Sequence, residues 1–436
     1  MTWKLFFSST LLLARLGASA SLTNQPTAHL AAGSAFNVRD FGAKGDNVTK
    51  DTTALQKALD ACAHAGGGTV VVPAGVYLTG SLALSSNTTL RLESNANLTG
   101  SPDIADYPLV SVRWEGEFAQ GHRALLSADH ADHLAITGPG SVTGPPLDLS
   151  RLRNPRGPAL IEITDAKDVL LEGFSTHYQR LWSIHPLFCQ NLTARNLTIR
   201  SSEVNGDGMD VDSCSDVLIE HCDINSGDDA ISLKSGRGQE AVRLARPTQN
   251  VVIRNCQLTS SLFAAIGIGS EMSGGIRNVR LENCTLTGHQ NAIFFKSRDG
   301  RGGFIEDVTG ENLSVKDSPS FVAINLLNKG IQASDPVLGD VEKWSTLRNI
   351  SFKNIQVENI NQLVAAANLP PEKPADGLTF ANLTGTCRKG MALANIHNAS
   401  LSAIKVTGFH GPLLTTQNVT GNGLGNPEPS PAGGTE

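Results

Sequence analysis

The chain is poor in aromatic and charged side chains, which make up 5% and 17% of its 436 residues. Its formal net charge of −6 excludes the strongly basic face that a nucleic-acid-binding protein needs. After residue 20, no apolar run approaches the roughly 20 residues that span a bilayer. Neither nucleic acid nor a membrane is therefore an expected partner, and an acidic ligand has to be held by a local group of cations.

Cysteine is also scarce, and the odd total of 7 leaves at least one thiol unpaired. Cys222, Cys256 and Cys284 each end an equivalent phrase, I-E-H-C, I-R-N-C and L-E-N-C. Equivalent positions in stacked repeats point the same way, so we expect a small buried column of thiols instead of a disulfide framework. The spacings are too wide for a zinc site.

The N-terminus has the pattern of a secretory signal over residues 1–20, with Lys4 before an apolar stretch and Ala18-Ser19-Ala20 at its end. A short buried helix is the alternative for this segment. We expect a linker over residues 21–35, one catalytic β domain over residues 36–420 and a disordered Pro/Gly-rich tail over residues 421–436. The sequence thus predicts a secreted, extracellular protein, or a periplasmic one in a bacterium.

One phrase recurs through the chain: Asn or Asp, then alternating apolar and polar residues, then Asn or Gly, then a second short strand. Its copies start about 23 to 42 residues apart, the range of coil-type repeats, at Asp168, Asn191, Asp216, Asn250, Asn278, Asp307 and Asn349. Period-two alternation without intervening amphipathic helices predicts an all-β, single-domain parallel β-helix, a solenoid with Val, Ile and Leu columns inside. The recurring Asn is expected at turns, where it tolerates left-handed geometry.

One helix is predicted over residues 51–63, with Asp51 or Thr52 as its N-cap and apolar residues at helical spacing. Because a solenoid needs caps over its open core, we expect this N-terminal capping helix to close one end. An insertion between Pro108 and Ser150 could wall off one end of a groove, which would favour cleavage at chain ends.

The residues 205–235 crowd five aspartates together with almost no local positive charge. Asp207 and Asp228 lie about one coil apart, so they should face the same side of neighbouring coils, with Asp229 beside them. Crowded carboxylates raise the pKa of one member, and such clusters serve as metal ligands or as acid/base pairs. The spacing does not match a calcium loop. We predict an acid/base site for glycosidic cleavage, with no metal and no cofactor, and structural roles for Asp210, Asp212 and Asp216.

Six short motifs follow in order between residues 36 and 420. They are F-N-V-R-D-F-G-A-K-G-D at 36–46, W-S-I-H-P at 182–186, N-G-D-G-M-D at 205–210, G-D-D at 227–229, I-G-S-E-M-S-G-G at 268–275 and F-F-K-S-R-D-G-R-G-G at 294–303. This set resembles glycoside hydrolase family 28, the polygalacturonase and rhamnogalacturonan hydrolase family. The resemblance implies a right-handed parallel β-helix that hydrolyses pectic polysaccharide with inversion, and we expect it to act as a monomer.

The resemblance also implies roles for individual residues. Asp228 is the expected general acid, and Asp207 and Asp229 are expected to activate the attacking water. Asn205 is expected to help orient the site, and Lys296 to bind a sugar carboxylate.

Further substrate contacts are suggested by the residues themselves. Arg301 is a candidate for an anionic glycan, and His185 is a candidate sugar contact whose equal alternative is a satisfied position in a packed strand. A wider basic groove could be built by Arg301 together with Lys234, Arg237, Arg243, Arg246 and Arg298.

The chain departs from the family pattern in two places. Where polygalacturonases usually carry Gly-His-Gly, this chain has Phe-Ala-Ala-Ile at 263–266, and where they carry Arg-Ile-Lys it has Phe-Phe-Lys at 294–296. These changes leave open a rhamnogalacturonan or xylogalacturonan hydrolase, or a neutral sugar at that subsite. A polysaccharide lyase and a non-catalytic glycan-binding β-helix are the further alternatives to a polygalacturonase-like enzyme.

Overall fold

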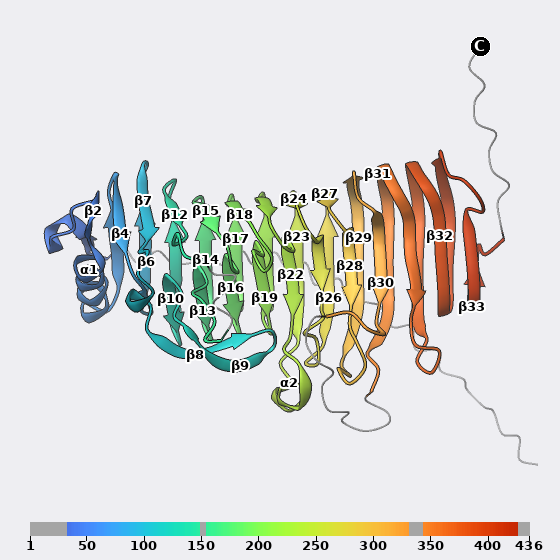
Figure 1. Ribbon diagram of the computed structural model, residues 1–436, viewed down its shortest axis with the longest axis horizontal. Coiled ribbons are helices and arrows are strands. Elements are labelled where there is room, and N and C mark those ends of the chain that lie inside the picture. Colours follow the sequence, from blue (N-terminus) through green and yellow to red (C-terminus); the bar gives the residue numbers. More distant parts are fainter. Residues whose placement is uncertain (1–32, 149–153, 331–342, 426–436) are drawn as a thin grey trace, which may run out of the picture.

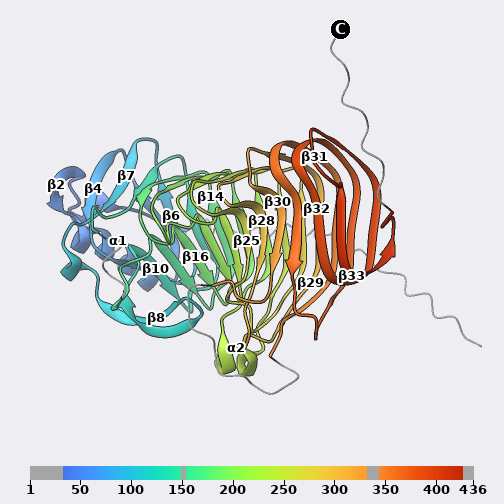
Figure 2. The ribbon, with the colours of Figure 1, turned by 45° about the vertical axis from the view of Figure 1, so that its right-hand side comes forward.

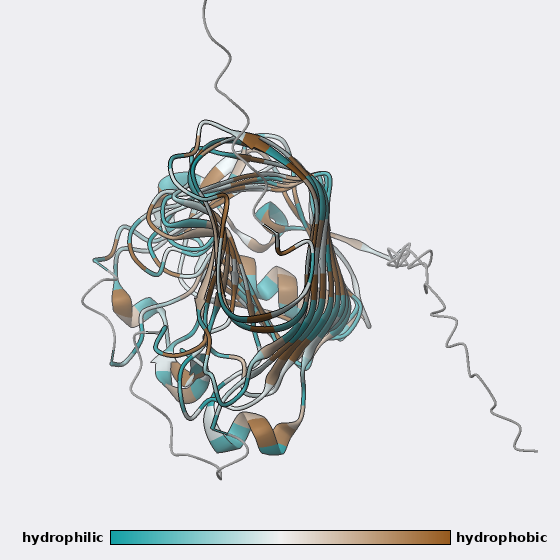
Figure 3. Ribbon diagram, turned by 90° about the vertical axis from the view of Figure 1, so that its right-hand side faces the viewer, coloured by the Kyte–Doolittle hydropathy of each residue, from teal (hydrophilic) through white to brown (hydrophobic). Residues whose placement is uncertain are grey.

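The computed structural model describes residues 33–148, 154–330 and 343–425. Short strands are wound into successive coils, and each strand pairs in parallel with its counterpart in the next coil (Figure 1). Viewed along the long axis, the coils stack on one another around a common interior (Figure 3). This is the predicted parallel β-helix.

Three rows of strands run along the stack. The first row carries the repeated Asn or Asp phrase and consists of β1 (Ala35–Asn37), β3 (Gly68–Val72), β6 (Thr88–Leu92), β11 (Leu134–Thr137), β14 (Lys167–Glu172), β17 (Gln190–Arg195), β20 (Ser215–Glu220), β23 (Thr248–Arg254), β26 (Ile276–Glu282), β29 (Phe304–Lys316), β31 (Thr346–Asn368), β32 (Ala375–Thr407) and β33 (Leu414–Asn422). The last strands are long and bend through more than one row, as Figure 2 shows for β31 and β32.

The second row consists of β2 (Asp46–Lys50), β4 (Gly75–Thr79), β7 (Ala96–Gly100), β12 (Ser141–Thr143), β15 (Ser175–Gln179), β18 (Thr198–Ser201), β21 (Asp223–Ser226), β24 (Gln257–Ser260) and β27 (Thr285–Gly288). The third row consists of β5 (Leu82–Leu84), β10 (Leu126–Asp129), β13 (Ile161–Thr164), β16 (Ile184–Leu187), β19 (Met209–Asp212), β22 (Ile231–Lys234), β25 (Ala264–Ile268), β28 (Asn291–Lys296) and β30 (Ser320–Asn325). The third row carries the acidic cluster.

Apolar columns fill the interior, as predicted. In the first row, side chains in register on successive coils are all buried: Val169, Leu192, Val217, Val251, Val279, Val308, Ile350 and Leu378. Burying one such side chain stabilises the fold by about 1.5–3 kcal/mol, so the repeated alternation is itself the main stabilising pattern.

The recurring Asn and Asp residues have left-handed backbone geometry, with φ of 58° at Asp216 and 55° at Asn250. They lie near the start of the first-row strands, not in turns. The second Asn of the phrase does lie at a bend between two strands, as predicted, with φ of 55° at Asn255 and 53° at Asn283. The side chains of the first Asn or Asp bond from coil to coil: Asn250 Nδ2 donates to Asp216 Oδ1 at 2.8 Å, and Asn278 Nδ2 donates to Asn250 Oδ1 at 2.7 Å. The repeat therefore builds an amide ladder along one edge.

The cysteine prediction is confirmed, because all seven are buried free thiols and Cys222, Cys256 and Cys284 occupy equivalent positions in successive coils.

Helix α1 (Thr52–His64) packs against the N-terminal coils, and its Leu55 and Leu59 belong to the main core. Its capping function stays a prediction. The Asp51 carboxylate does not cap the helix but accepts from the amides of Lys44 and Gly45.

Five further elements lie outside the rows. The short helices are η1 (Val38–Phe41), η2 (Ile104–Asp106) and α2 (Gly238–Leu244), and β8 (Leu109–Trp114) and β9 (Glu117–His122) form an antiparallel hairpin that crosses the outside of the third row (Figures 1 and 2). The predicted signal, most of the linker and most of the tail lie outside the described residues. Within the described ranges, no helix combines the length and apolarity needed to cross a membrane.

Candidate active site

A groove of about 270 Å³ opens over the third row, at strands β19, β22, β25 and β28. Five predicted site residues line it: Asn205, Asp207, Asp228, Asp229 and Lys296. The parallel pairing explains why they meet. Asp207 and Asp228-Asp229 precede neighbouring strands of one row, and the amide of Gly208 donates to the carbonyl of Asp229 at 3.0 Å.

The three carboxylates form one compact cluster. One oxygen from each of Asp207, Asp228 and Asp229 lies within 4.8 Å of one from each of the others. Their exposed fractions are only 3%, 8% and 1%. Burial and the charges of neighbouring carboxylates raise the pKa values of Asp207 and Asp228.

Asp228 is held by two backbone amides. Its Oδ2 accepts from the amide of Asn205 at 3.0 Å, and its Oδ1 accepts from its neighbour Asp229 at 2.9 Å. Burial, followed by the charge of Asp229, raises the pKa of Asp228 to about 6 despite these amides and the nearby Lys296. A carboxylic acid that keeps its proton up to pH 6 is suited to general acid catalysis.

Asp207 lies deeper, above a buried ion pair. Lys234 Nζ lies 2.8 Å from Asp210 Oδ1 and 4.0 Å from Asp207 Oδ2, and it stacks on the Trp182 ring at 3.9 Å from the centroid. Burial, and then the charges of Asp210 and Asp228, raise the pKa of Asp207 well above its ordinary range. Lys234 thus compensates part of the negative charge of Asp207 and Asp210. Asp210 has the structural role predicted for it.

Asp229 is paired with Lys296, whose Nζ lies 2.5 Å from Asp229 Oδ2. Burial alone would lower the pKa of Lys296, but the carboxylates of Asp229 and Asp228 raise it above its ordinary value. Three carboxylate oxygens at this spacing could ligate a cation. Here the lysine ammonium already provides a positive charge within the cluster.

Two predicted contacts are wrong, because both side chains are fully buried. His185 has no exposed surface, and its ring nitrogens lie 3.1 Å from Glu162 Oε2 and 3.9 Å from Asp212 Oδ2. Arg301 is also fully buried, and its Nη1 donates to the carbonyl of Ser270 at 3.3 Å. Neither can reach a sugar in the groove, and both stabilise its floor instead.

The predicted wide basic groove is not assembled either. Lys234 is buried in its ion pairs, Arg237 is 2.5 Å from Glu117 of the hairpin, and Arg246 pairs with Asp165 at a different cavity. Within the described part of the groove wall, the remaining exposed lysine is Lys329. Charge alone therefore does not attract an anion to this site.

Several groove residues were not assigned by the sequence. Phe263 and Phe294 line the side near Lys296. Phe294 stands where the family pattern has its arginine, and Phe263 lies within the stretch that replaces Gly-His-Gly. Glu271 lies 3.7 Å from Lys234, and although burial raises its pKa, Lys234 and Arg301 hold it below its ordinary value. Glu271 lies in the I-G-S-E-M-S-G-G motif at 268–275, so the family motif marked this residue. The motif did not predict its ion pair with Lys234.

The hairpin closes the N-terminal end of the groove. Trp114 of β8 packs on Trp182 with ring centroids 4.7 Å apart, and Glu115 at the hairpin tip lines the groove. A Cβ on Gly116 would lie 2.9 Å from side-chain atoms of both Arg237 and Glu271, so the tip approaches the groove wall as closely as a glycine allows. Part of the predicted insertion thus stands at the groove end.

Comparisons with known proteins agree with this architecture. Residues 62–403 match the family described as Glycosyl hydrolases family 28. A probable polygalacturonase of Vitis vinifera is 30% identical over 79% of this chain and 73% of its own length. The family 28 exopolygalacturonase of Yersinia enterocolitica has a TM-score of 0.77 at 21% identity, over 90% of this chain and 79% of that one.

A hyperthermoactive exopolygalacturonase from Thermotoga maritima gives a TM-score of 0.67 at 24% identity, over 91% of this chain and 93% of that one. At such low identity the two structures establish the fold alone, whereas the family match covers most of the sequence. The chain belongs to family 28 of the glycosyl hydrolases.

Proposed function

We propose that this protein is a secreted hydrolase of galacturonic-acid-containing pectic polysaccharide, of the polygalacturonase type. The observation that carries the proposal is the buried cluster of Asp207, Asp228 and Asp229 in an open groove, with the pKa of Asp228 raised to about 6. A binding protein gains nothing from an acid and its carboxylate partners at such a distance, whereas glycosidic cleavage requires them.

In the proposed mechanism, Asp228 donates its proton to the glycosidic oxygen as the bond to the anomeric carbon breaks. Asp207 and Asp229 orient a water, and one of them takes its proton as the water oxygen attacks that carbon. Lys296, at 2.5 Å, compensates the charge of Asp229. The backbone amide of Asn205 donates to Asp228 Oδ2 at 3.0 Å and so fixes the position of the Asp228 carboxyl group. One water is consumed, and one new reducing end is formed.

We infer inversion of the anomeric configuration. A separation near 5 Å between two acting carboxyl groups is typical of retention, and roughly 6.5–9.5 Å of inversion, whereas the nearest oxygens here lie within 4.8 Å. The short distance does not indicate retention here, because the site has three carboxylates instead of two. Asp207 and Asp229 can hold the attacking water, and Asp228 can act as the general acid. Proton NMR of the first product anomer tests this: a β-anomer from an α-linked substrate supports inversion, and an α-anomer contradicts it.

The substrate class is supported by the two lysines and by the named relatives. Lys296 and the exposed Lys329 can meet a uronate carboxylate, and the Vitis vinifera relative is described as a probable polygalacturonase. The apolar Phe263 and Phe294 favour a neutral or esterified sugar beside Lys296. This is the specific observation in favour of the second candidate, a rhamnogalacturonan or xylogalacturonan hydrolase.

Product analysis tests the proposal. The purified protein is incubated with homogalacturonan, rhamnogalacturonan and xylogalacturonan, and both reducing ends and unsaturated uronide are measured. Reducing ends from one substrate without unsaturated product are expected. Unsaturated product would identify a lyase, and a folded protein that binds but cleaves none of the substrates would make the non-catalytic glycan-binding β-helix the better account.

The closed groove end supports cleavage near a chain end. Glu115 and the packed pair of Trp114 and Trp182 leave the groove bounded on the side of the hairpin. We therefore expect mono- or digalacturonate as the first product from a long chain. Shortening the hairpin by removing residues 112–119 should add longer products, and a broad initial mixture from the unmodified protein would contradict the expectation.

A further inference from the structure

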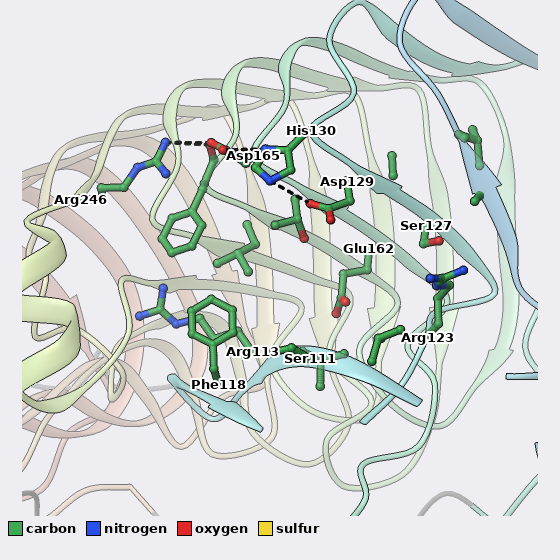
Figure 4. Close-up of a pocket in the computed structure, with 18 residues that line it drawn as sticks. Ser111, Arg113, Phe118, Arg123, Ser127, Asp129, His130, Glu162, Asp165 and Arg246 are labelled. Carbon is green, nitrogen blue, oxygen red and sulfur yellow. Dashed lines mark hydrogen bonds and ion pairs between the residues drawn. The ribbon is translucent and has the colours of Figure 1, made fainter. Parts of the chain in front are cut away.

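A second cavity, of about 540 Å³, lies between the hairpin and strands β10, β13 and β16 of the third row (Figure 4). Ser111, Phe118 and Arg123 line it from the hairpin segment, and Glu162 and Phe188 line it from the coils. We call it the hairpin cavity. Its volume falls in the range of roughly 300–1,000 Å³ that is typical of small-molecule sites.

The hairpin cavity is separate from the active-site groove, and the two have no lining residue in common. A continuous buried wall divides them: Trp182 lines the groove, Arg156 lies over its ring at 5.9 Å, and Arg156 Nη2 is 2.8 Å from Glu162 Oε2 at the cavity. Trp182 and Arg156 are each 1% exposed. These buried side chains therefore separate the groove from the hairpin cavity inside the protein.

Glu162 presents a hydrogen-bond acceptor to the cavity. Its Oε2 is engaged by Arg156 and lies 3.1 Å from His185 Nδ1, whereas its Oε1 receives no donor within the described residues. Burial raises its pKa, but the charges of Arg156 and His185 lower it to about 2, so it is ionised. Figure 4 shows its carboxylate directed into the space between the strands and the hairpin. An ionised oxygen in this position favours hydroxyl donors.

Arg123 presents a donor from the other side. Its backbone is fixed, because its amide donates to the carbonyl of Pro108 at 2.9 Å and its carbonyl accepts from Ser81 Oγ at 3.0 Å. Its guanidinium has no partner among the described residues. An arginine that is anchored at its backbone but unpaired at its head can donate to hydroxyl or carboxylate oxygens of a ligand.

An aromatic surface completes the cavity. Phe118 is 43% exposed, its ring centroid lies 6.4 Å from that of Phe188, and the Arg113 guanidinium lies over both rings at 5.7 and 5.2 Å. The formal charges of the lining balance, since three arginines face three carboxylates, Asp129, Glu162 and Asp165. An apolar face with both donors and acceptors, and no net charge, fits a polyhydroxylated ring better than a polyanion.

We propose that the hairpin cavity binds a second saccharide, a short neutral or singly carboxylated segment that is distinct from the chain being cleaved. The choice of a saccharide rests on the proposed function. A side branch or neighbouring chain held there would keep the polymer close to the groove and raise its local concentration.

Calorimetry with the Asp228→Asn protein tests the proposal without turnover. Trigalacturonate and β-1,4-galactotriose are titrated in separate experiments. Taken together, the two titrations should show two sites, one in the groove and one in the hairpin cavity. Arg123→Met in the same background should weaken the second site about tenfold, the usual effect of losing one charge-assisted hydrogen bond. Arg388→Met, which changes an exposed arginine on β32 far from both cavities, is the matched control and should keep both sites.

Ser111→Trp provides an independent variant, because it fills the cavity from the exposed face of the hairpin and removes no buried contact. It should abolish the second site and leave groove binding intact. The proposal would be overturned if the two titrations of the Asp228→Asn protein together show only one site. It would also be overturned if binding at the second site is unchanged in both Arg123→Met and Ser111→Trp. Failure of the proposed function is a separate outcome, seen as absence of hydrolysis by the wild-type protein.

Discussion

Lys296 Nζ lies 2.5 Å from Asp229 Oδ2 although the two residues belong to coils that are not adjacent. Asp229 precedes β22 and Lys296 ends β28, with β25 between them. The contact is possible because Gly267 occupies the intervening position of β25, where a Cβ would lie 2.1 Å from Asp229 Oδ2. A glycine on one coil thus allows a cation on the next to reach the acid on the previous one.

Replacement of Lys296 by Met should alter both activity and stability. The nearby Lys296 charge lowers the pKa of Asp228, so its loss should move the basic limb of the rate profile to higher pH while kcat falls. Breaking a buried ion pair on one side costs about 3–5 kcal/mol of unfolding free energy. The pH–rate profile and urea unfolding measure the two effects. Lys329→Met, the exposed lysine of the same groove, should leave unfolding unchanged; an equal loss of stability there would contradict the account.

Replacement of Gly267 by Ala should displace the Asp229 carboxylate and separate it from Lys296. Misplacement of a catalytic group by about 1 Å can cost on the order of 10²-fold in rate. We expect that loss in kcat with little change in KM. Gly425→Ala is the control, since a Cβ there meets no atom within 4 Å. Unaltered kcat in Gly267→Ala would show that the ion pair is not needed.

The raised pKa of Asp228 predicts two pH effects in the native protein that the Asp228→Asn variant should lack. Hydrolysis should decline as pH rises through about 6, where the acid loses its proton. Because its folded pKa lies above its unfolded value, Asp228 contributes stability that is present below about pH 4 and is lost as pH rises through about 6. The contribution is on the order of 2–3 kcal/mol. Urea unfolding at pH 4 and pH 7 should show this difference between the two proteins.

The amide ladder is expected to stabilise the coil stack. Asn250 has φ of 55° and bonds to both Asp216 and Asn278. Asn250→Gly keeps the backbone geometry and loses the two bonds, which should cost about 1 kcal/mol. Asn250→Ala adds left-handed strain of about 1–2 kcal/mol. Equal unfolding free energies for the two variants, measured in urea, would contradict the strain contribution.

Much of the fold was predictable because its signals are local and repeated. Period-two alternation and an Asn or Asp near the strand start recur in the middle coils, and Cys follows three successive first-row strands, so one coil predicts the next. The acid cluster was predictable for the same reason, since Asp207 and Asp228 lie about one repeat apart and the coils then bring them together.

The parts that were not predicted depend on contacts between distant segments. His185 looked available in its motif, but Glu162 from the preceding coil and Asp212 from the following coil bury it. Arg301 is likewise buried beside Ser270. The role of Lys234 required both Asp210 and Trp182 to be placed in space, and the groove wall required the hairpin tip at Glu115.

The most direct test of the central claim is the rate of reducing-end release from polygalacturonate by the wild-type protein and by Asp228→Asn. Asp223→Asn, an exposed aspartate on the neighbouring β21, serves as the matched control. The account predicts hydrolysis by the wild type and by Asp223→Asn, with a loss of about 10²–10⁴-fold in Asp228→Asn, the size expected for removal of a general acid. Equal rates in Asp228→Asn and the wild type would contradict it.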